Sequence, residues 1–324
     1  MRAVLYDRTG PAPEVLTVAE VDRPEPGPGE VRVRVALSGI NPVDVKVRGG
    51  AIPRRVDGPL VPHDDGVGVI DAVGAGVDEG RVGQRVWLWL AAVGGRWGTA
   101  AEWVVVPAAQ AVPLPDTASD ELGACLGVPA LTAHQCVLGD GPVSGRTVLV
   151  QGGAGAVGHF AVQLARWSGA RVLATVGSAA NAVLARQAGA HAVVDHRDTD
   201  ATAQLQAIAP VVDRIVEVAL VDNFARDLAL SRPGTTIVTY ASDGRDLQLP
   251  LRACMNACVT LRFMLLYAIP EQARLDAVRD VSAALADRAL APLPVRHYSL
   301  DDAAAAHEDV EAGRGGKVVL DLRG

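Results

Sequence analysis

The spacing of apolar residues changes part-way along the chain, near residue 120. Before that point, short apolar segments are separated by turns rich in glycine and proline, and Val31–Val35 alternates apolar and basic residues. Alternation with a period of two predicts a half-buried strand, and Val67–Val73 and Arg85–Trp89 are predicted strands as well. The first part of the chain is therefore predicted to form an irregular β-barrel.

Beyond residue 120, short strands alternate with helices. Residues 119–138 have helical spacing, with Ser119 or Asp120 as the predicted N-cap. The alternation that follows predicts βαβ units around a parallel sheet. The predicted strands are 147–151, 171–176, 192–194, 214–218, 235–240 and 317–320, and the predicted helices are 157–168, 180–188, 223–230 and 271–289.

A glycine-rich turn lies between the first of these strands and its helix, in the sequence VLVQGGAGAVGHFAV. In a dinucleotide-binding turn, Gly153 would permit the tight turn, Gly155 would let a pyrophosphate approach the backbone, and Gly158 would let the helix pack closely on the sheet. The phosphates would meet the helix N-terminus at Ala156 and Val157. The alternative is a turn with a purely structural role, but the strand before it and the helix after it are the context that the motif requires.

The second predicted strand of this half bears on the choice of cofactor. An NAD site usually has an acidic residue about 20 positions after the glycines, whereas this strand ends in Gly177 and Ser178. A 2′-phosphate would meet no carboxylate there, and His196 and Arg197 are its candidate partners, unless they are only solvated loop residues. NADPH is the predicted cofactor, and NADH is the alternative.

Composition and charge narrow the class of protein. The 324 residues are 49% hydrophobic and 21% charged, and the net charge of −7 argues against a general binder of nucleic acid or anionic membranes. Neither a signal peptide nor an apolar segment long enough to span a bilayer is recognisable. The four cysteines have no C-x-x-C spacing and are interpreted as reduced core residues, which predicts a cytoplasmic protein.

Four segments together resemble the zinc-independent quinone oxidoreductase (zeta-crystallin-like) branch of the medium-chain dehydrogenase/reductase superfamily. They are SGINPVD at Ser38–Asp44, PHDDGVGVIDAVGAG at Pro62–Gly76, GVPALTA at Gly127–Ala133, and VQGGAGAVGHFAVQLAR at 150–166. The resemblance runs nearly from end to end of the chain. It implies an α/β protein: a GroES-like catalytic domain over 1–120, completed by 268–324, around a Rossmann domain over 121–267.

The resemblance also implies an active site in a cleft between the two domains and a homodimer. It places further candidate residues near the nicotinamide, where they would contact or cover the cofactor. These residues are Asn41, Thr132, Tyr240, Met264, Leu265 and Lys317.

Zinc divides this superfamily, because its alcohol dehydrogenases hold a catalytic zinc that polarises the substrate oxygen. The corresponding positions here are Asn41, Asp64 and Val128, and His63 is one position out of register. The sequence therefore predicts no metal site. Without a Lewis acid, the substrate must accept hydride readily, and quinones and conjugated enones meet that requirement.

Two departures from the family pattern leave the proton donor open. The family often has tyrosines where this chain has Lys46 and Ile52. Asp44 or Lys46 could replace the donor, so the predicted catalytic residues are Asn41, Asp44 and Lys46. Two alternatives to quinone reduction remain: an alkene (enone or enoyl) reductase of a biosynthetic intermediate, and an NADPH-binding protein without catalytic activity.

Overall fold

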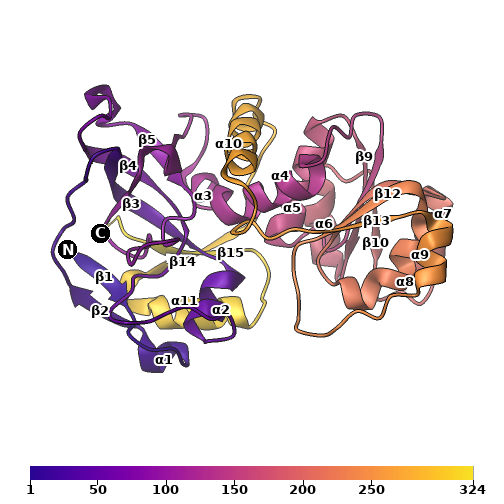
Figure 1. Ribbon diagram of the computed structural model, residues 1–324, viewed down its shortest axis with the longest axis horizontal. Helices are drawn as coiled ribbons and strands as arrows, with labels where there is room; N and C mark the ends of the chain where they lie inside the picture. Colours follow the sequence, from indigo (N-terminus) through magenta and orange to yellow (C-terminus); the bar gives the residue numbers. More distant parts are fainter. Residues whose placement is uncertain (324) are drawn as a thin grey trace. The chain divides into compact units, whose positions relative to one another are not determined.

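The computed structural model describes residues 1–323, which form two compact units (Figure 1). The first unit comprises Met1–Val128 and the segment from Pro294 onward, and the second comprises Pro129–Leu293. The predicted domain boundaries, 120/121 and 267/268, both lie earlier in the chain than the boundaries between the two units, 128/129 and 293/294. The second boundary differs because α10 (Glu271–Ala286) packs on helices α4 and α5 of the second unit, whereas the prediction places residues 268–324 in the first domain.

The first unit is built on a seven-stranded sheet in which the strand order is β14-β15-β3-β4-β5-β7 and β6 also pairs with β3. All of the pairings are antiparallel except that between β14 and β15. A separate antiparallel pair, β1 and β2, completes the β structure. The elements are β1 (Arg2–Leu5), α1 (Ala12–Val15), β2 (Thr17–Glu20), β3 (Glu30–Ile40), α2 (Pro42–Arg48), β4 (Asp65–Val73), η1 (Glu79–Arg81), β5 (Arg85–Leu88), β6 (Trp103–Pro107), η2 (Ala108–Gln110), β7 (Ala111–Pro113), α3 (Asp120–Gly123), β14 (Val295–Ser299), η4 (Leu300–Asp302), α11 (Ala303–Glu311) and β15 (Lys317–Asp321).

The C-terminal segment completes this sheet from within. Strand β15 runs antiparallel to β3, with Val318 opposite Ile40, and on its other side β3 pairs with β4, with Gly39 opposite Asp65. Three strand ends from distant parts of the sequence therefore lie side by side. Helices α2 and α11 lie together against this sheet (Figure 1).

The second unit is a six-stranded parallel sheet in the order β10-β9-β8-β11-β12-β13. This is the 3-2-1-4-5-6 order of the doubly wound dinucleotide-binding fold, so the predicted parallel α/β architecture is confirmed. The elements are α4 (Leu131–Leu138), β8 (Thr147–Val150), α5 (Ala156–Trp167), β9 (Arg171–Val176), α6 (Ala179–Gln187), β10 (Ala192–Asp195), α7 (Ala201–Ile208), β11 (Val212–Glu217), α8 (Leu220–Leu230), β12 (Ser231–Thr239), α9 (Leu251–Ala257), β13 (Thr260–Phe263) and α10.

Two local predictions were wrong. The helix predicted over 119–138 is interrupted: α3 ends at Gly123, and a π-helical turn at Leu126–Ala130, which contains Pro129, precedes α4. A proline has no N–H to donate and restricts the residue before it, which explains the interruption. The cysteines are all free, but Cys258 is exposed in a left-handed conformation at the end of α9 rather than in the core.

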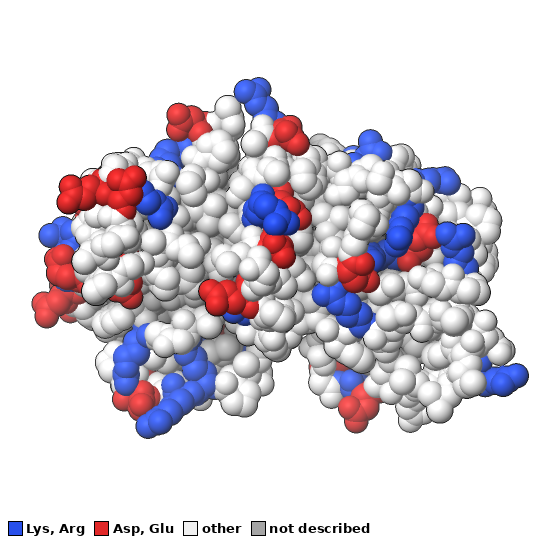
Figure 2. All heavy atoms as spheres, turned by 45° about the horizontal axis from the view of Figure 1, so that its top comes forward, with Lys and Arg blue, Asp and Glu red and all other residues white. Residues whose placement is uncertain are grey.

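The surface of the folded chain carries charges of both signs, and its helices are not strongly apolar. On the face drawn in Figure 2, acidic and basic side chains form small mixed groups with uncharged surface between them. Among residues 1–323, no helix is both long and apolar enough to cross a bilayer.

Candidate functional site

The glycine-rich turn connects β8 to α5 in the second unit. The left-handed φ of +71° belongs to Gly152, one residue earlier than predicted. A Cβ atom on Gly153 would lie 2.7 Å from the Cβ of Ala174, and one on Gly158 would lie 2.2 Å from the carbonyl oxygen of Gly152. Gly153 therefore permits close packing on β9, and Gly158 permits close packing of the helix on the turn.

The start of α5 meets the requirements of a phosphate site. The first helical hydrogen bond runs from His159 N–H to Gly155 C=O at 2.8 Å. The amides of Ala156, Val157 and Gly158 therefore precede the intrahelical ladder and have no acceptor among residues 1–323. A Cβ atom on Gly155 would meet only the Gly152 carbonyl oxygen, at 3.4 Å, so space is left beside these amides. Free amides and the positive end of the helix dipole fit an anionic pyrophosphate.

A buried polar chain behind the turn holds it in place. The Thr175 hydroxyl donates to Gln151 Oε1 at 2.6 Å and accepts from Gly152 N–H at 3.2 Å, and Gln151 Nε2 donates to Asp227 at 2.9 Å. Burial, and then the neighbouring Glu217, raise the pKa of the Asp227 carboxyl well above its usual range. No motif in the sequence indicates this chain, because its members come from the turn after β8, from β9 and from α8.

The residues predicted to recognise the ribose phosphate come together only in part. Ser178 caps α6, and its hydroxyl accepts from Asn181 N–H at 3.1 Å. The His196 ring lies against Gly177, where a Cβ atom would be 2.9 Å from Nε2. Arg197 is paired with Asp195 at 2.6 Å, and this pairing lowers the pKa of the half-buried Asp195 carboxyl to about 2. Asp195 ends β10, one strand beyond β9, where an NAD site usually has its acidic residue.

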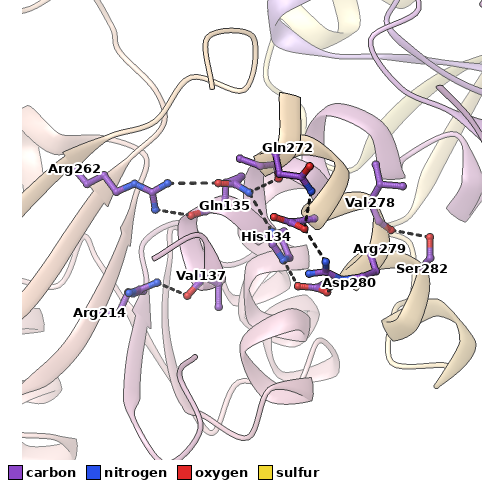
Figure 3. Close-up of polar contacts among 12 residues, drawn as sticks. His134, Gln135, Val137, Arg214, Arg262, Gln272, Val278, Arg279, Asp280 and Ser282 are labelled. Atoms are coloured by element: carbon purple, nitrogen blue, oxygen red, sulfur yellow. Dashed lines mark hydrogen bonds and ion pairs between the residues drawn. The ribbon is translucent and has the colours of Figure 1, made fainter. Parts of the chain in front are cut away.

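Thr132 is buried on α4. Polar contacts hold the middle and the C-terminal part of this helix (Figure 3). Arg262 donates to the carbonyl oxygen of Gln135 at 3.0 Å, where a cation stabilises the last turn of the helix. The His134 ring is 2.8 Å from Asp280 on α10. Of the other residues predicted near the nicotinamide in this unit, Met264 is buried, Tyr240 is partly buried and Leu265 is exposed.

In the first unit, a compact polar cluster forms where β15, β3 and β4 end side by side. Asn41 Nδ2 donates to Asp65 at 2.7 Å, and Lys317 Nζ donates to Asn41 Oδ1 at 2.5 Å and lies 3.7 Å from Asp65. Asp65 also accepts from Val128 N–H at 2.7 Å. The amide of Asn41 therefore has one defined orientation, because its oxygen faces the ammonium and its nitrogen faces the carboxylate.

Asp44 and Lys46 differ in their surroundings although both lie on α2. Asp44 is buried and accepts from Asn41 N–H at 2.7 Å at the start of the helix. Lys46 is exposed, as expected because two residues span about 200° around a helix axis. The structure therefore brings Asn41, Asp44 and Lys317 into one neighbourhood, and Lys46 faces away from it.

The electrostatics of the cluster follow from three buried carboxyl groups close to one ammonium. Burial raises the pKa of the Asp65 carboxyl to about 6, although Lys317 and the hydrogen bond from Asn41 oppose the shift. Burial and the neighbouring Asp64 raise the pKa of Asp44 well above its usual range. The cluster can therefore hold a proton near neutral pH.

A hydrogen-bond chain behind the cluster has one consistent set of proton positions when both of its imidazoles are neutral. The Thr99 hydroxyl donates to the carbonyl oxygen of Asp65 at 2.6 Å, so it must accept from Ser38 at 2.7 Å. Ser38 in turn accepts from His63 Nδ1–H at 2.8 Å, and the other ring nitrogen of a neutral His63, Nε2, accepts from His307 Nε2–H at 2.9 Å. A protonated His63 would instead donate from both of its ring nitrogens.

Burial enforces that neutrality. The exposed fractions of His63 and His307 are 1% and 0%. Burial lowers the pKa of His63 well below its usual range and that of His307 to about 3. His63 also has a φ of +78°, which is uncommon for a residue with a Cβ atom. Nothing in the sequence pattern indicates that these residues support Asp65, because the contacts run through Ser38 and Thr99, which are distant in sequence.

The positions expected of zinc ligands hold other chemistry. Asn41 and Val128 both hydrogen-bond to Asp65, Val128 through its backbone, and Asp64 accepts from Ala92 N–H at 3.2 Å. An amide and a valine offer little to Zn²⁺, which binds thiolate, imidazole and carboxylate. Among residues 1–323, no group of three or more His, Cys, Asp or Glu is placed to hold a metal ion.

Comparisons with known proteins define the family. The family model described as "Alcohol dehydrogenase GroES-like domain" matches residues 27–116, and the one described as "Zinc-binding dehydrogenase" matches residues 156–283. Quinone oxidoreductase of Rattus norvegicus is 30% identical over 326 residues, which cover 99% of this chain and 97% of that protein. The chain therefore belongs to the medium-chain dehydrogenase/reductase superfamily, with a GroES-like and a Rossmann-type domain.

Within that superfamily the chain is quinone oxidoreductase-like, which confirms the resemblance noted from the four motifs. Two solved structures are similar over the whole chain. An NAD-dependent alcohol dehydrogenase has a TM-score of 0.89 at 29% identity, covering 99% of this chain and 100% of that one. A mycobacterial protein complexed with NADPH has a TM-score of 0.84 at 28% identity, covering 99% of each chain.

Proposed function

We propose that the protein is an NADPH-dependent reductase that transfers hydride to a quinone or a related conjugated carbonyl compound without a metal ion. The observation that carries the proposal is the cluster of Asn41, Asp65 and Lys317. A polarising group is needed at the acceptor oxygen, and these residues supply an amide and an ammonium where zinc-dependent relatives hold zinc ligands. The similarity to quinone oxidoreductases and to a protein complexed with NADPH supports the same activity.

The second unit supplies residues that fit the cofactor. The free amides of α5 would hold its pyrophosphate, with Gly153, Gly155 and Gly158 keeping the approach open. Thr132 and Tyr240 are proposed neighbours of the nicotinamide, as are Met264 and Leu265. When bound, the cofactor supplies two electrons and a hydrogen nucleus as hydride.

NADPH is favoured over NADH by the chemistry at the end of β9. Gly177 and Ser178 present no carboxylate to repel a 2′-phosphate, and Arg197 lies on the adjacent loop. Arg197 is already paired with Asp195, so its contribution to affinity is reduced by that competition. We therefore propose a preference for NADPH over NADH that is weaker than an unpaired arginine would give.

In the first unit, Asn41 would orient the acceptor, because its amide is fixed between Lys317 and Asp65. Asp44 holds the start of α2 through Asn41 N–H and would keep Asn41 in place. Lys46 remains a proposal from the sequence with no support from its exposed position. A homodimer and a cytoplasmic location also remain predictions.

The test is turnover of a panel of quinones and enones with NADPH and with NADH, followed by nicotinamide absorbance after chelator treatment. We expect quinone reduction that survives chelation and a lower KM for NADPH. Activity lost on chelation and restored by zinc would contradict the metal-free proposal. Tight NADPH binding without turnover would instead favour a binding protein.

The rival activity, reduction of a conjugated C=C bond, is distinguished by its product. An enone offered with NADPH gives a saturated ketone if hydride adds to the β-carbon. Mass spectrometry of that product, with quinones inert in the same assay, would select the alkene reductase.

A further inference from the structure

Lysine is rare in this chain. There are 28 arginines and two lysines, Lys46 and Lys317. Lys46 is exposed, whereas Lys317 is 4% exposed at the first position of β15. An arginine is permanently charged and holds its donors in a rigid fork, whereas a lysine is a point charge that can give up a proton. The cation buried in the polar cluster is therefore a lysine, which can act as an acid, and not an arginine, which cannot.

The contacts of Lys317 leave donor capacity unused. Its ammonium has three N–H groups. One donates to Asn41 Oδ1 at 2.5 Å, and another can point toward Asp65 at 3.7 Å. The third has no acceptor among residues 1–323. A buried charged donor without an acceptor is costly, so a site that retains one is suited to receive an oxygen atom from a ligand.

We infer that Lys317 is the catalytic residue that binds the acceptor oxygen and protonates it, an assignment that rests on the proposed function. Asp65 is then a positioning residue, because it acts through the ammonium, and Asn41 holds the ammonium as well as orienting the acceptor. This assignment replaces Asp44 and Lys46 as the proton donor expected from the sequence.

The step balances without a further reagent. As hydride adds to the acceptor, an electron pair of its conjugated system moves onto the carbonyl oxygen, and the negative charge develops beside the Lys317 ammonium. An N–H bond of Lys317 breaks and an O–H bond forms on that oxygen. The acceptor gains two electrons and two hydrogen nuclei, and the neutral Lys317 amine regains its proton from water.

The first test uses 4-nitrophenol, whose phenolate form is yellow and mimics the monoanion of a reduced quinone. The probe is titrated with pH while bound to protein saturated with NADP⁺. We expect the bound probe to ionise at a lower pH than the free probe in the wild-type protein. Lys317→Met should remove this shift and lower kcat by about 100-fold, the scale of a lost general acid. Lys317→Arg should keep the shift, because it keeps the charge, but lose most of the turnover.

The second test needs no substitution at the site and therefore does not depend on the folding of a variant. With lysine labelled at ¹³Cε, the NMR spectrum contains two side-chain signals, and Lys46→Arg assigns them. Addition of 4-nitrophenol should move the Lys317 signal more than the Lys46 signal.

The double variant Lys317→Met, Asp65→Asn is the control for the activity test. It checks whether an unpaired carboxylate, rather than the lost ammonium, explains any loss of activity.

The outcomes separate this assignment from the proposed function. If quinones turn over but Lys317→Met has unchanged kcat and unchanged probe ionisation, the function stands and the assignment of Lys317 is wrong. A Lys317 signal that does not respond to the probe overturns it as well. If no acceptor turns over, the proposed function fails, and the probe ionisation and NMR shifts still show whether Lys317 binds an anionic oxygen.

Discussion

Acid should destabilise this protein through two buried histidines, His63 and His307. Both have folded-state pKa values lowered by burial, so the unfolded chain takes up protons before the folded chain does. Stability is therefore lost as the pH falls below the unfolded value of about 6.5. The positive charges of Lys317 and Arg48 act on His63 and His307, respectively, in the same direction as burial.

The size of the effect follows from the pKa of His307, about 3. Each pH unit between that value and 6.5 costs about 1.4 kcal/mol, so acidification to pH 5 costs about 2 kcal/mol. This loss is a substantial part of a typical total stability of about 5–15 kcal/mol. His63, whose pKa is also lowered, adds to the loss in the same direction. Buried carboxyl groups with raised pKa act in the opposite direction, and for Asp65, with a pKa of about 6, this effect falls between about pH 4 and 6.

A variant isolates the histidine contribution from that of the carboxyl groups. In His307→Gln, the side-chain amide can still donate to His63, but residue 307 no longer titrates. Urea unfolding of both proteins at pH 7.5 and pH 5.0 gives the difference. Tryptophan fluorescence mainly follows the first unit, which contains four of the five tryptophans, Trp87, Trp89, Trp97 and Trp103.

We expect His307→Gln to lose about 2 kcal/mol less than the wild type between the two pH values. Any cost of the substitution itself is present at both pH values and cancels in the comparison. The matched control is His297→Gln, at a histidine that is 36% exposed, and it should lose as much as the wild type. An equal loss in His307→Gln would show that the buried pair does not stay neutral.

Three further predictions concern the two sites. Gly158→Ala should abolish dinucleotide binding measured by calorimetry, because its Cβ would lie 2.2 Å from the Gly152 carbonyl oxygen, whereas Gly95→Ala, whose Cβ would lie 4.0 Å from the backbone nitrogen of Trp97, should bind normally. Arg197→Ala should weaken binding of NADPH about fivefold, the scale of one exposed ionic contact, and leave NADH unchanged; equal effects on both would contradict a 2′-phosphate contact. The activity should fall as the pH drops through about 6, where Asp65 gains a proton and no longer pairs with the cation; a kcat that is flat from pH 5 to 8 would exclude this role.

The features that depend on local sequence were predictable. The spacing of Gly153, Gly155 and Gly158 predicted the glycine-rich turn between the strand β8 and the helix α5, because such a turn depends on residues close together in sequence. The residues at the positions expected of zinc ligands could also be named from the sequence, because Asn41, Asp64 and Val128 each lie within one of the four motifs. The break in the predicted helix at Pro129 could have been anticipated from the proline itself.

The features that depend on strand pairing were not predictable. Lys317 lies beside Asn41 because β15 pairs with β3, and no spacing in the sequence sets that register. Lys46 was a candidate proton donor because it stands where the family often has a tyrosine, but the helix turns it to the outside. His63 is one position from the expected zinc-ligand position, and only the fold shows that it supports Asp65 through Ser38 and Thr99.

The place of β15 in the first sheet also determines when the protein can fold during its synthesis. Lys317 follows Asn41 by 276 residues, so almost the whole chain must leave the ribosome before the three buried carboxyl groups around Asn41 meet their cation. The second unit is continuous in sequence and can fold while the first still lacks its final strand. The usual N-to-C order of domain folding is thereby reversed. A nascent chain released early would contain a folded second unit and a first unit that lacks β15.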